Sequence, residues 1–215
     1  MAGKFISIEG IEGAGKSTQL AFIQRYLTEQ GKQLVVTREP GGTELGEQIR
    51  TLLLTPTSTG MAVDTELLLM FAARAEHVEQ VIKPALKRND WVLSDRFVDA
   101  TFAYQGGGRG IDLQRISTLS DWTLKGLQTD VTFLFDLPVE IGQQRVLSRN
   151  QTIDRFEQEK VDFFQRIRER YLQRAQQEPN RIKVIDASKS IGEIEFLSHL
   201  AIDESSLSFD CLSHR

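Results

Sequence analysis

The sequence predicts an α/β fold in which a parallel sheet is covered by helices on both faces. Two observations support this prediction. Short, continuously apolar runs alternate along the chain with longer helix-like segments, and hydrophobic residues make up 40% of the chain, which is enough for a core. With 215 residues, the chain is expected to form one domain, 1–215, or one domain with a mobile insertion.

The apolar runs are predicted to be the strands of the sheet, because parallel strands covered on both faces are apolar throughout. In chain order they are residues 5–9, 33–37, 91–94, 131–135 and 182–185. Such sheets bind ligands at the carboxyl ends of their strands. The residues that follow these runs are therefore candidates for a functional site.

The segments between the strands are predicted to be helices, in chain order 17–30, 45–54, 65–87, 112–127 and 161–177, with 191–200 as a last helix. The first of them places Leu20, Ile23 and Leu27 on one face, as an amphipathic helix does. Three stretches interrupt the alternation: a glycine-rich one expected to be a flexible turn, a polar and highly charged one, and a serine-rich tail expected to be peripheral. They are residues 105–110, 145–160 and 203–215.

The composition argues against several classes of protein. A net charge of −4 disfavours general binding of nucleic acids, which usually requires a basic face. The single cysteine, Cys211, excludes an internal disulfide and fits a reducing cytoplasm. We expect no signal peptide, because the chain enters its first strand at once, and no apolar run approaches the length of a membrane span.

A glycine-rich motif between the first strand and the first helix carries most of the functional information. Residues 10–17, Gly-Ile-Glu-Gly-Ala-Gly-Lys-Ser, match the phosphate-binding P-loop pattern G-x-x-x-x-G-K-[ST]. Glycines with positive φ allow backbone N–H groups to surround phosphate oxygens, and the helix N-terminus adds partial positive charge. Lys16 is expected between the β- and γ-phosphates, and Ser17 on Mg²⁺. The predicted nucleotide-binding residues are Gly10, Ile11, Glu12, Gly13, Ala14, Gly15, Lys16, Ser17 and Thr18.

Charged residues follow the second and third strands as well. Asp95 suits a water-mediated contact with Mg²⁺, and the guanidinium of Arg96 suits a phosphate. Arg38 precedes a tight Glu-Pro-Gly-Gly turn and can point into the same crevice. The alternatives stay open at this point: a structural ion pair at the third strand, and a solvated charge beside an ordinary turn at the second.

Arg74 and the arginines of the polar stretch each have a functional and a structural interpretation. Arg74 shares a helix face with Met70 and Phe71, which suits a base held between them, although both neighbours are equally typical of a core. The polar stretch 145–160 supplies three arginines of the kind that neutralise charge when a lid closes, or that lie in a solvated loop: Arg145, Arg149 and Arg155. The three histidines are scattered and show no metal-site spacing.

On these motifs the chain resembles the bacterial thymidylate kinases. The matching segments occur in the family's order between about residues 4 and 187: 9–18, 37–43, 72–74, 81–86, 95–97, 103–110 and 154–157. The resemblance implies a nucleoside-monophosphate kinase fold with a five-stranded parallel sheet, a mobile lid at about 145–160 and a cytoplasmic homodimer. It also implies transfer of a phosphoryl group from ATP, with Mg²⁺, to dTMP, which gives dTDP and ADP for dTTP synthesis.

The resemblance assigns roles residue by residue. Glu12 would meet the sugar 3′-hydroxyl of dTMP, and Tyr104 would crowd the 2′ position. Either Met70 or Phe71 would stack on the base: the family often places its aromatic residue at the position of Met70, and Phe71 is the aromatic residue beside it. The dTMP-binding set is then Glu12, Arg38, Phe71, Arg74, Arg96, Thr101, Tyr104 and Gln105, the catalytic set is Lys16, Arg96, Arg149 and Arg155, and the metal ligands are Ser17 and Asp95.

The P-loop contains no arginine, so the chain resembles the type of thymidylate kinase whose catalytic arginine lies in the lid. The lid run 148–154 departs from the family's common Arg-Gly-Glu-Leu-Asp form, and the tail beyond residue 200 has no counterpart. Three alternatives remain: a P-loop kinase of another nucleoside monophosphate or small metabolite, a P-loop switch protein, and a non-catalytic ATP-binding protein. The absence of an Asn-Lys pair disfavours a guanine-binding switch, and the intact Lys16 and Ser17 disfavour a non-catalytic protein.

Overall fold

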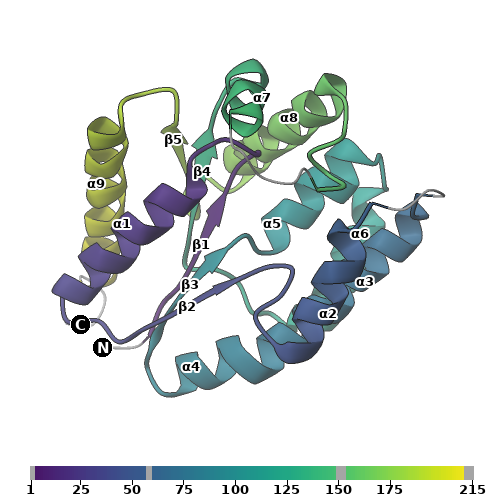
Figure 1. Cartoon of the computed structure of the whole chain (residues 1–215). Coiled ribbons are helices and arrows are strands. Elements are labelled where there is room, and N and C mark those ends of the chain that lie inside the picture. Colours follow the sequence, from purple (N-terminus) through teal and green to yellow (C-terminus); the bar gives the residue numbers. More distant parts are fainter. Residues whose placement is uncertain (1–2, 57–59, 149–153, 211–215) are drawn as a thin grey trace.

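The computed structural model describes residues 3–56, 60–148 and 154–210. Five strands form one sheet in the order β2-β3-β1-β4-β5, and every neighbouring pair is parallel (Figure 1). The strands are β1 (Phe5–Glu9), β2 (Leu34–Arg38), β3 (Trp91–Asp95), β4 (Val131–Asp136) and β5 (Ile182–Asp186). The predicted α/β fold and its five parallel strands are confirmed. Asp95 is the last residue of β3, one residue beyond the predicted end.

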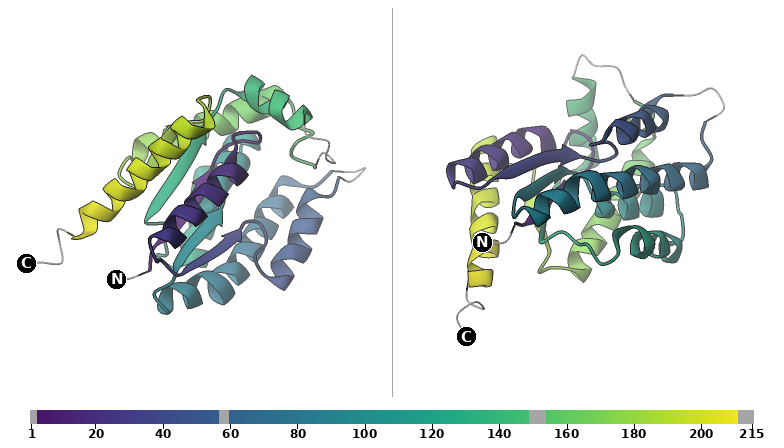
Figure 2. Two further views of the ribbon diagram at one scale, coloured as in Figure 1. Left: turned by 60° about the vertical axis from the view of Figure 1, so that its left-hand side comes forward. Right: turned by 90° about the horizontal axis from the view of Figure 1, so that it is seen from below.

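Helices cover both faces of the sheet, as Figures 1 and 2 show. Helices α1 and α9 pack together on one face, whereas α4 and α8 pack on the other. Their bounds are α1 (Lys16–Glu29), α2 (Glu44–Leu54), α3 (Val63–His77), α4 (Lys83–Lys87), α5 (Val98–Thr101), α6 (Leu113–Leu124), α7 (Val139–Leu147), α8 (Val161–Gln177) and α9 (Ile191–Asp210). Two π-helical segments, η1 (Val78–Ile82) and η2 (Phe102–Gly108), continue α3 and α5.

The core lies between the sheet and these helices. The central strand β1 is buried along its whole length, while the edge strand β2 is partly exposed. Ile8 and Leu93 from the sheet pack with Ile23 and Leu27 from α1, and all four are almost completely buried. The apolar central strands thus hold β1, and the loop that follows it, in a fixed position.

The glycine-rich segment 105–110, predicted to be a flexible turn, is largely helical instead. Residues 102–108 form η2, and most of them are buried. The glycines allow close packing: a Cβ on Gly107 would lie 2.7 Å from the carbonyl oxygen of Arg166, and one on Gly108 would lie 2.5 Å from the ring of Phe163. Absence of a side chain here serves contact with α8 rather than flexibility.

Two helices extend beyond the sequence prediction. Helix α7 was not predicted, and the polar stretch from residue 145 begins inside it. The last helix, predicted over 191–200, continues as α9 to Asp210. The predicted helix 65–87 consists of α3, η1 and α4 in succession. Arg149 lies outside the described residues. Among the described helices, we find none with the length and hydropathy needed to cross a membrane.

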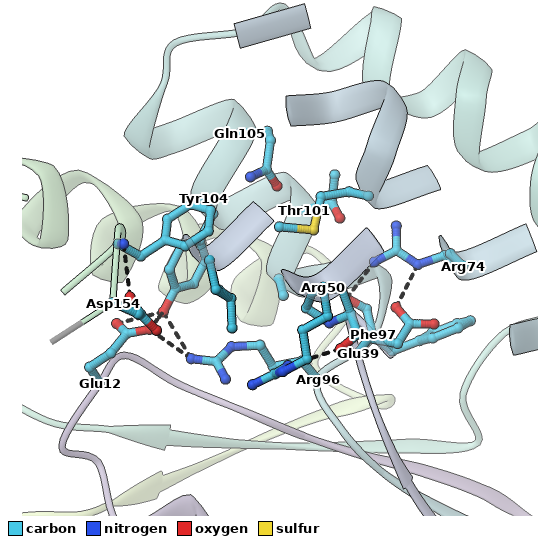
Figure 3. Close-up of a pocket in the computed structure, with 15 residues that line it drawn as sticks. Glu12, Glu39, Arg50, Arg74, Arg96, Phe97, Thr101, Tyr104, Gln105 and Asp154 are labelled. Atoms are coloured by element: carbon cyan, nitrogen blue, oxygen red, sulfur yellow. Dashed lines mark hydrogen bonds and ion pairs between the residues drawn. The ribbon is translucent and has the colours of Figure 1, made fainter. Parts of the chain in front are cut away.

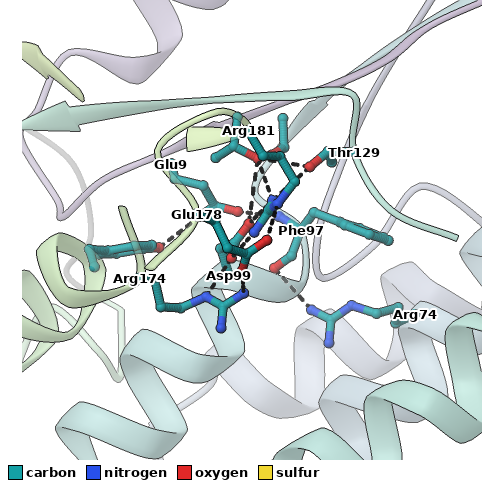
Figure 4. Close-up of polar contacts among 11 residues, drawn as sticks. Glu9, Arg74, Phe97, Asp99, Thr129, Arg174, Glu178 and Arg181 are labelled. Atoms are coloured by element: carbon teal, nitrogen blue, oxygen red, sulfur yellow. Dashed lines mark hydrogen bonds and ion pairs between the residues drawn. The ribbon is translucent and has the colours of Figure 1, made fainter. Parts of the chain in front are cut away.

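A buried ion cluster lies beneath the sheet, on the side of α5 and α8. Asp99 is buried, and both of its carboxylate oxygens accept hydrogen bonds from arginines (Figure 4). Arg181 donates from two nitrogens at 2.7 and 2.9 Å, and Arg174 donates from Nε at 2.5 Å. Thr129 and Glu178 accept further hydrogen bonds from the same guanidinium groups. The cluster joins α5 to α8 and to the start of β5.

We expect Asp99→Ala to lower the free energy of unfolding by about 3–5 kcal/mol, because removing one partner leaves two largely buried guanidinium groups uncompensated. Urea denaturation monitored by circular dichroism measures this loss. Asp64→Ala is the matched control, since Asp64 forms an exposed ion pair with Arg115 at 3.0 Å, and should cost about 0–1 kcal/mol. Equal losses in the two variants would contradict the structural role of Asp99.

Candidate active site

The P-loop lies between the end of β1 and the start of α1, as predicted. Gly10, Gly13 and Gly15 all have positive φ, at 140°, 79° and 82°. Lys16 is the first residue of α1, and its buried ammonium donates to the carbonyl oxygens of Gly10 at 3.0 Å and Ile11 at 2.9 Å. Burial, and then the nearby charge of Arg96, lower the pKa of Lys16 to about 8. The loop therefore holds a lysine whose charge its present surroundings disfavour.

Helix α7 supports the P-loop from outside. A Cβ on Gly13 would lie 2.3 Å from the carbonyl oxygen of Gly142, and one on Gly142 would lie 2.6 Å from that of Glu12. The two backbones touch because both positions are glycine. Arg145, a candidate lid residue from the sequence, instead donates to the carbonyl oxygens of Gly13 at 3.2 Å and Ala187 at 3.3 Å. Arg145 thus contributes to the support of the loop.

A pocket opens beside the P-loop at the carboxyl ends of β1, β2 and β3 (Figure 3). Polar and charged side chains from several elements line it together with apolar ones: Glu12, Glu39, Pro40, Arg50, Leu54, Met70, Arg74, Arg96, Phe97, Ala100, Thr101, Tyr104, Gln105, Asp154 and Phe156. Six predicted dTMP-binding residues are among them: Glu12, Arg74, Arg96, Thr101, Tyr104 and Gln105. The remaining two, Arg38 and Phe71, are not.

Glu12 connects the P-loop to this pocket. Arg96 donates to Oε1 of Glu12 at 2.8 Å, and the hydroxyl of Tyr104 donates to Oε2 at 2.7 Å. Arg96 and Tyr104 also contact each other at 3.2 Å. Figure 3 shows these three side chains together at one end of the pocket. A residue of the nucleotide-binding loop is therefore in direct contact with two groups of the neighbouring pocket.

The backbone of Arg96 adopts an unusual conformation, with φ at 69° in the left-handed region. This conformation costs about 1–2 kcal/mol for a residue other than glycine, and neighbouring hydrogen bonds hold it. The Arg96 N–H donates to Ile8 at 2.9 Å, the Ser94 hydroxyl donates to the Arg96 carbonyl at 2.7 Å, and the next N–H, of Phe97, donates to Glu9 at 2.7 Å. Burial, and then the charge of Asp99, raise the pKa of Glu9.

Arg50, which the sequence did not suggest, brings another positive charge to the pocket. It donates to the carbonyl oxygen of Pro40 at 2.9 Å. Burial lowers the pKa of Arg50, and the nearby guanidinium groups of Arg38 and Arg96 lower it further. An anion bound near these three guanidinium groups would relieve their mutual repulsion. Arg38 itself is exposed and pairs with Glu47 at 2.8 Å, so it borders this region without lining the pocket.

At the opposite end of the pocket, Arg74 is buried and held on two sides. Its Nε donates to Oε2 of Glu39 at 2.7 Å and its Nη2 to the carbonyl oxygen of Phe97 at 3.2 Å. Nη1 has no hydrogen-bond partner among the residues that the structure describes. Buried donors rarely stay unpaired, so Nη1 of Arg74 is a candidate for a hydrogen bond to a ligand.

Phe71, one of the two candidates for stacking on the base, lies in the core instead of the pocket. Its ring packs with Leu67 and Ile116, 5.0 Å from the guanidinium carbon of Arg74. Met70, the alternative, lines the pocket together with Phe97, which the sequence did not suggest. Helical spacing places both Met70 and Phe71 on the same face as Arg74. The spacing therefore does not predict which of the two faces the ligand.

Gln105 and Arg155 both contact one buried carboxylate, that of Glu66. Gln105 donates to Glu66 at 2.8 Å, and Arg155 forms an ion pair with it at 2.7 Å. Arg155 also donates to the carbonyl oxygen of Leu53 at 2.7 Å. The structure therefore brings Gln105 to the pocket, whereas Arg155, a predicted catalytic residue, is bound to α2 through Leu53 and to α3 through Glu66.

The oxygen atoms beside the P-loop fit a hard cation such as Mg²⁺. Oδ1 of Asp95 is buried and accepts no hydrogen bond from any described residue, and Ser17 is the second residue of α1. Within the described ranges, no group of three or more His, Cys, Asp or Glu residues could hold a metal by itself. A cation here would therefore complete its coordination with oxygen atoms of a ligand or of water.

Comparisons with known proteins indicate one family. The family model for thymidylate kinase matches residues 8–196. A thymidylate kinase from Vesicomyosocius okutanii is 56% identical over 191 residues, which cover 89% of this chain and 93% of that protein. One from Pseudomonas putida is 54% identical over 195 residues, which cover 91% and 92%.

A solved structure extends the comparison to the fold. The crystal structure of thymidylate kinase from Ehrlichia chaffeensis superimposes with a TM-score of 0.72 at 36% identity, covering 86% of this chain and 93% of that one. The matched family model spans the P-loop and the pocket beside it. The chain therefore belongs to the thymidylate kinase family.

Proposed function

We propose that the P-loop binds ATP, that the pocket beside it binds dTMP, and that the γ-phosphoryl group passes directly between them. Phosphorylation of dTMP by ATP is the reaction of the family to which the chain belongs. The observation that carries the assignment of sites is Glu12, a P-loop residue that contacts Arg96 and Tyr104 in the pocket. Two substrates bound on either side of Glu12 would lie next to each other.

The two ends of the pocket suit the two ends of a nucleoside monophosphate. Arg50 and Arg96 lie where the dTMP phosphate would bind, and Arg38 borders them. At the other end, where the base would bind, Arg74 offers Nη1, which has no hydrogen-bond partner in the described part of the chain. Thr101 and Gln105 line the same end, and Met70 and Phe97 supply apolar surface for the ring. Glu12 would meet the sugar 3′-hydroxyl, and Tyr104 would restrict space at the 2′ position.

Catalysis in this proposal consists of positioning and neutralisation of charge. The dTMP phosphate is already ionised, so no general base is needed. Lys16 and Arg96 would stabilise the negative charge that develops as the phosphoryl group moves. Arg149 and Arg155 complete the proposed set as lid arginines. For Arg155 this requires release from Glu66, and normal turnover in Arg155→Ala would remove it from the set.

We further propose that Ser17 and Asp95 hold Mg²⁺ together with the phosphates of ATP. When bound, the ion would neutralise phosphate charge and orient the γ-phosphoryl group. Oδ1 of Asp95 supports this role, because it accepts no hydrogen bond from the described residues and the nearest positive charge among them, Nη1 of Arg96, is 3.9 Å away. Removal of Mg²⁺ with EDTA should abolish turnover, and Asp95→Asn should raise the Mg²⁺ concentration needed for half-maximal rate.

A coupled assay with ATP and separate monophosphates tests the proposed function. We expect dTMP to be phosphorylated with a higher kcat/KM than UMP, CMP or AMP. Faster turnover of any of these three would instead indicate a kinase of another monophosphate. Binding of ATP without turnover of any acceptor would contradict the kinase assignment altogether.

The pKa of Lys16 predicts a pH dependence. Below pH 8 the lysine is charged and can bind phosphate, whereas above it the charge is lost. The kcat/KM for ATP is therefore expected to be level below about pH 8 and to fall about tenfold per pH unit above it. Lys16→Arg keeps its charge and should abolish this decline. A decline that persists in Lys16→Arg would assign the titration to another group, such as Glu9.

We propose that the chain forms a cytoplasmic homodimer and a single domain, 1–215, in which residues about 145–160 act as a lid. Exposed apolar side chains on three neighbouring helices support the dimer: Leu45 and Leu52 on α2, Leu68 on α3, and Trp122 on α6. Trp122 is 75% exposed, which is unusual for this residue. A sedimentation mass of two chains is expected, and a mass of one chain would contradict the dimer.

A further inference from the structure

A buried histidine that the proposed mechanism does not use lies behind the base end of the pocket. His77, the last residue of α3, is completely buried. Its Nδ1 lies 2.9 Å from Oε1 of Glu39, and its Nε2 lies 2.7 Å from the hydroxyl of Thr37. A carboxylate only accepts hydrogen bonds, so Nδ1 is the donor to Glu39. The ring is thus fixed by one partner on β2 and one in the turn that follows.

The other oxygen of the same carboxylate holds Arg74. Oε2 of Glu39 accepts a hydrogen bond from Nε of Arg74 at 2.7 Å. Glu39 and Arg74 are only 4% and 3% exposed, so little water competes for these contacts. The two carboxylate oxygens of Glu39 are therefore each engaged, one by His77 and one by Arg74, and neither side chain can rotate without breaking a buried contact.

The guanidinium group of Arg74 is further constrained by its remaining neighbours. Nη2 donates to the carbonyl oxygen of Phe97, and the rings of Phe71 and Phe97 lie 5.0 and 5.6 Å from the guanidinium carbon. Nε donates to Glu39 and one N–H of Nη2 donates to Phe97, so Nη1 is the nitrogen of this group that has no partner among the described residues. Figure 3 shows Arg74 facing the end of the pocket where Thr101 lies. The direction of Nη1 is therefore set by Glu39 and by the carbonyl group of Phe97, and Glu39 is in turn held by His77.

We propose that His77 is a positioning residue for recognition of the base. By fixing Glu39, it aims Nη1 of Arg74 at a hydrogen-bond acceptor on the edge of a pyrimidine, such as the 4-oxo group of thymine. A 4-amino group, as in cytosine, would place a donor against this donor. His77 therefore contributes to the preference for dTMP over dCMP without touching either nucleotide. This inference rests on the proposed function.

The test compares two variants of His77 in assays with dTMP and dCMP. His77→Leu removes both hydrogen bonds, whereas His77→Asn keeps a donor close to the position of Nδ1. We expect His77→Leu to raise KM for dTMP and to lower the ratio of kcat/KM for dTMP to that for dCMP by about tenfold, the effect of one hydrogen bond. KM for ATP should not change. His77→Asn should recover most of the dTMP preference.

Two controls separate positioning from general loss of structure. His199 packs against Tyr26, on α1 at the opposite face of the sheet, and His199→Leu should leave the ratio unchanged. Thr37→Val is close to isosteric and removes only the contact with Nε2, so it should lower the ratio in the same direction even if His77→Leu does not fold. In an Arg74→Ala background, His77→Leu should cause no further change in the ratio.

The outcomes distinguish the inference from the proposed function. Turnover of dTMP by the unmodified chain, with a preference over dCMP, supports the proposed function on its own. Given that result, the role of His77 is overturned if folded His77→Leu leaves the ratio of kcat/KM for dTMP to that for dCMP unchanged. If His77→Leu does not fold, an unchanged ratio in Thr37→Val overturns it. An equal loss of kcat/KM with dTMP and with dCMP also overturns it. So does a further change in the ratio when His77→Leu is added to Arg74→Ala. If the unmodified chain does not phosphorylate dTMP, the proposed function itself has failed.

Discussion

Lys16→Met is expected to lower kcat by a factor on the order of a thousand, while the affinity for dTMP stays nearly unchanged. Lys16 lies at the start of α1, and its ammonium already contacts the carbonyl oxygens of Gly10 and Ile11 within the P-loop. The substitution keeps most of the apolar stem of the side chain but removes the charge that we propose to lie beside the γ-phosphate. Steady-state kinetics with ATP and dTMP, together with calorimetric titration of dTMP, measure both quantities.

The control for this variant is Lys87→Met, at the exposed end of α4. It changes the net charge by the same amount, so it reveals any general electrostatic effect on nucleotide binding. We expect kcat within a factor of about two of the unmodified chain, as for an exposed residue remote from the site. A Lys16→Met protein that folds and keeps kcat within tenfold would contradict the assignment of the P-loop as the site of phosphoryl transfer.

Arg96→Met is expected to reduce kcat/KM for dTMP on the order of a thousandfold, and to weaken dTMP binding as well. Unlike Lys16, Arg96 is proposed to contact the acceptor phosphate before transfer as well as during it, so both KM and kcat should change. The variant also removes the 2.8 Å contact with Glu12, which keeps its hydrogen bond from Tyr104. Kinetics at varied dTMP concentration separate the two effects.

Arg88→Met serves as the matched control for Arg96, since Arg88 is exposed and pairs only with its neighbour Asp90 among the described residues. No change in kcat/KM is expected from it. Arg96→Lys adds a second comparison: it keeps the charge but loses the planar fork, and should recover only part of the activity. Full recovery by lysine would show that charge alone, without hydrogen-bond geometry, accounts for the role of Arg96.

The sequence predicted those parts of the site that depend on local pattern. The P-loop is a contiguous motif whose glycine conformations follow from its residues, and Asp95 and Arg96 follow a strand that is recognisable by its apolar run. Their meeting at one edge of the sheet then follows from parallel strands. These features need no knowledge of how distant helices pack.

The residues that the sequence missed depend on packing between distant segments. Arg50 reaches the pocket only because α2 folds back over the turn at Pro40, and nothing near it in the sequence marks it as functional. The glycines of 105–110 indicated a turn, but Gly107 and Gly108 are required for contact with α8. The choice between Met70 and Phe71 likewise depends on Leu67 and Ile116, which draw Phe71 into the core.

The left-handed backbone of Arg96 has a consequence for protein engineering. Glycine would adopt this conformation without cost, and asparagine at lower cost than arginine. The chain therefore keeps at this position a residue that backbone energetics disfavour, in exchange for its guanidinium group. A library screened for thermal stability alone would be drawn toward small residues at position 96 and would accumulate folded but inactive proteins, so a stabilisation campaign on this enzyme needs to select for turnover as well.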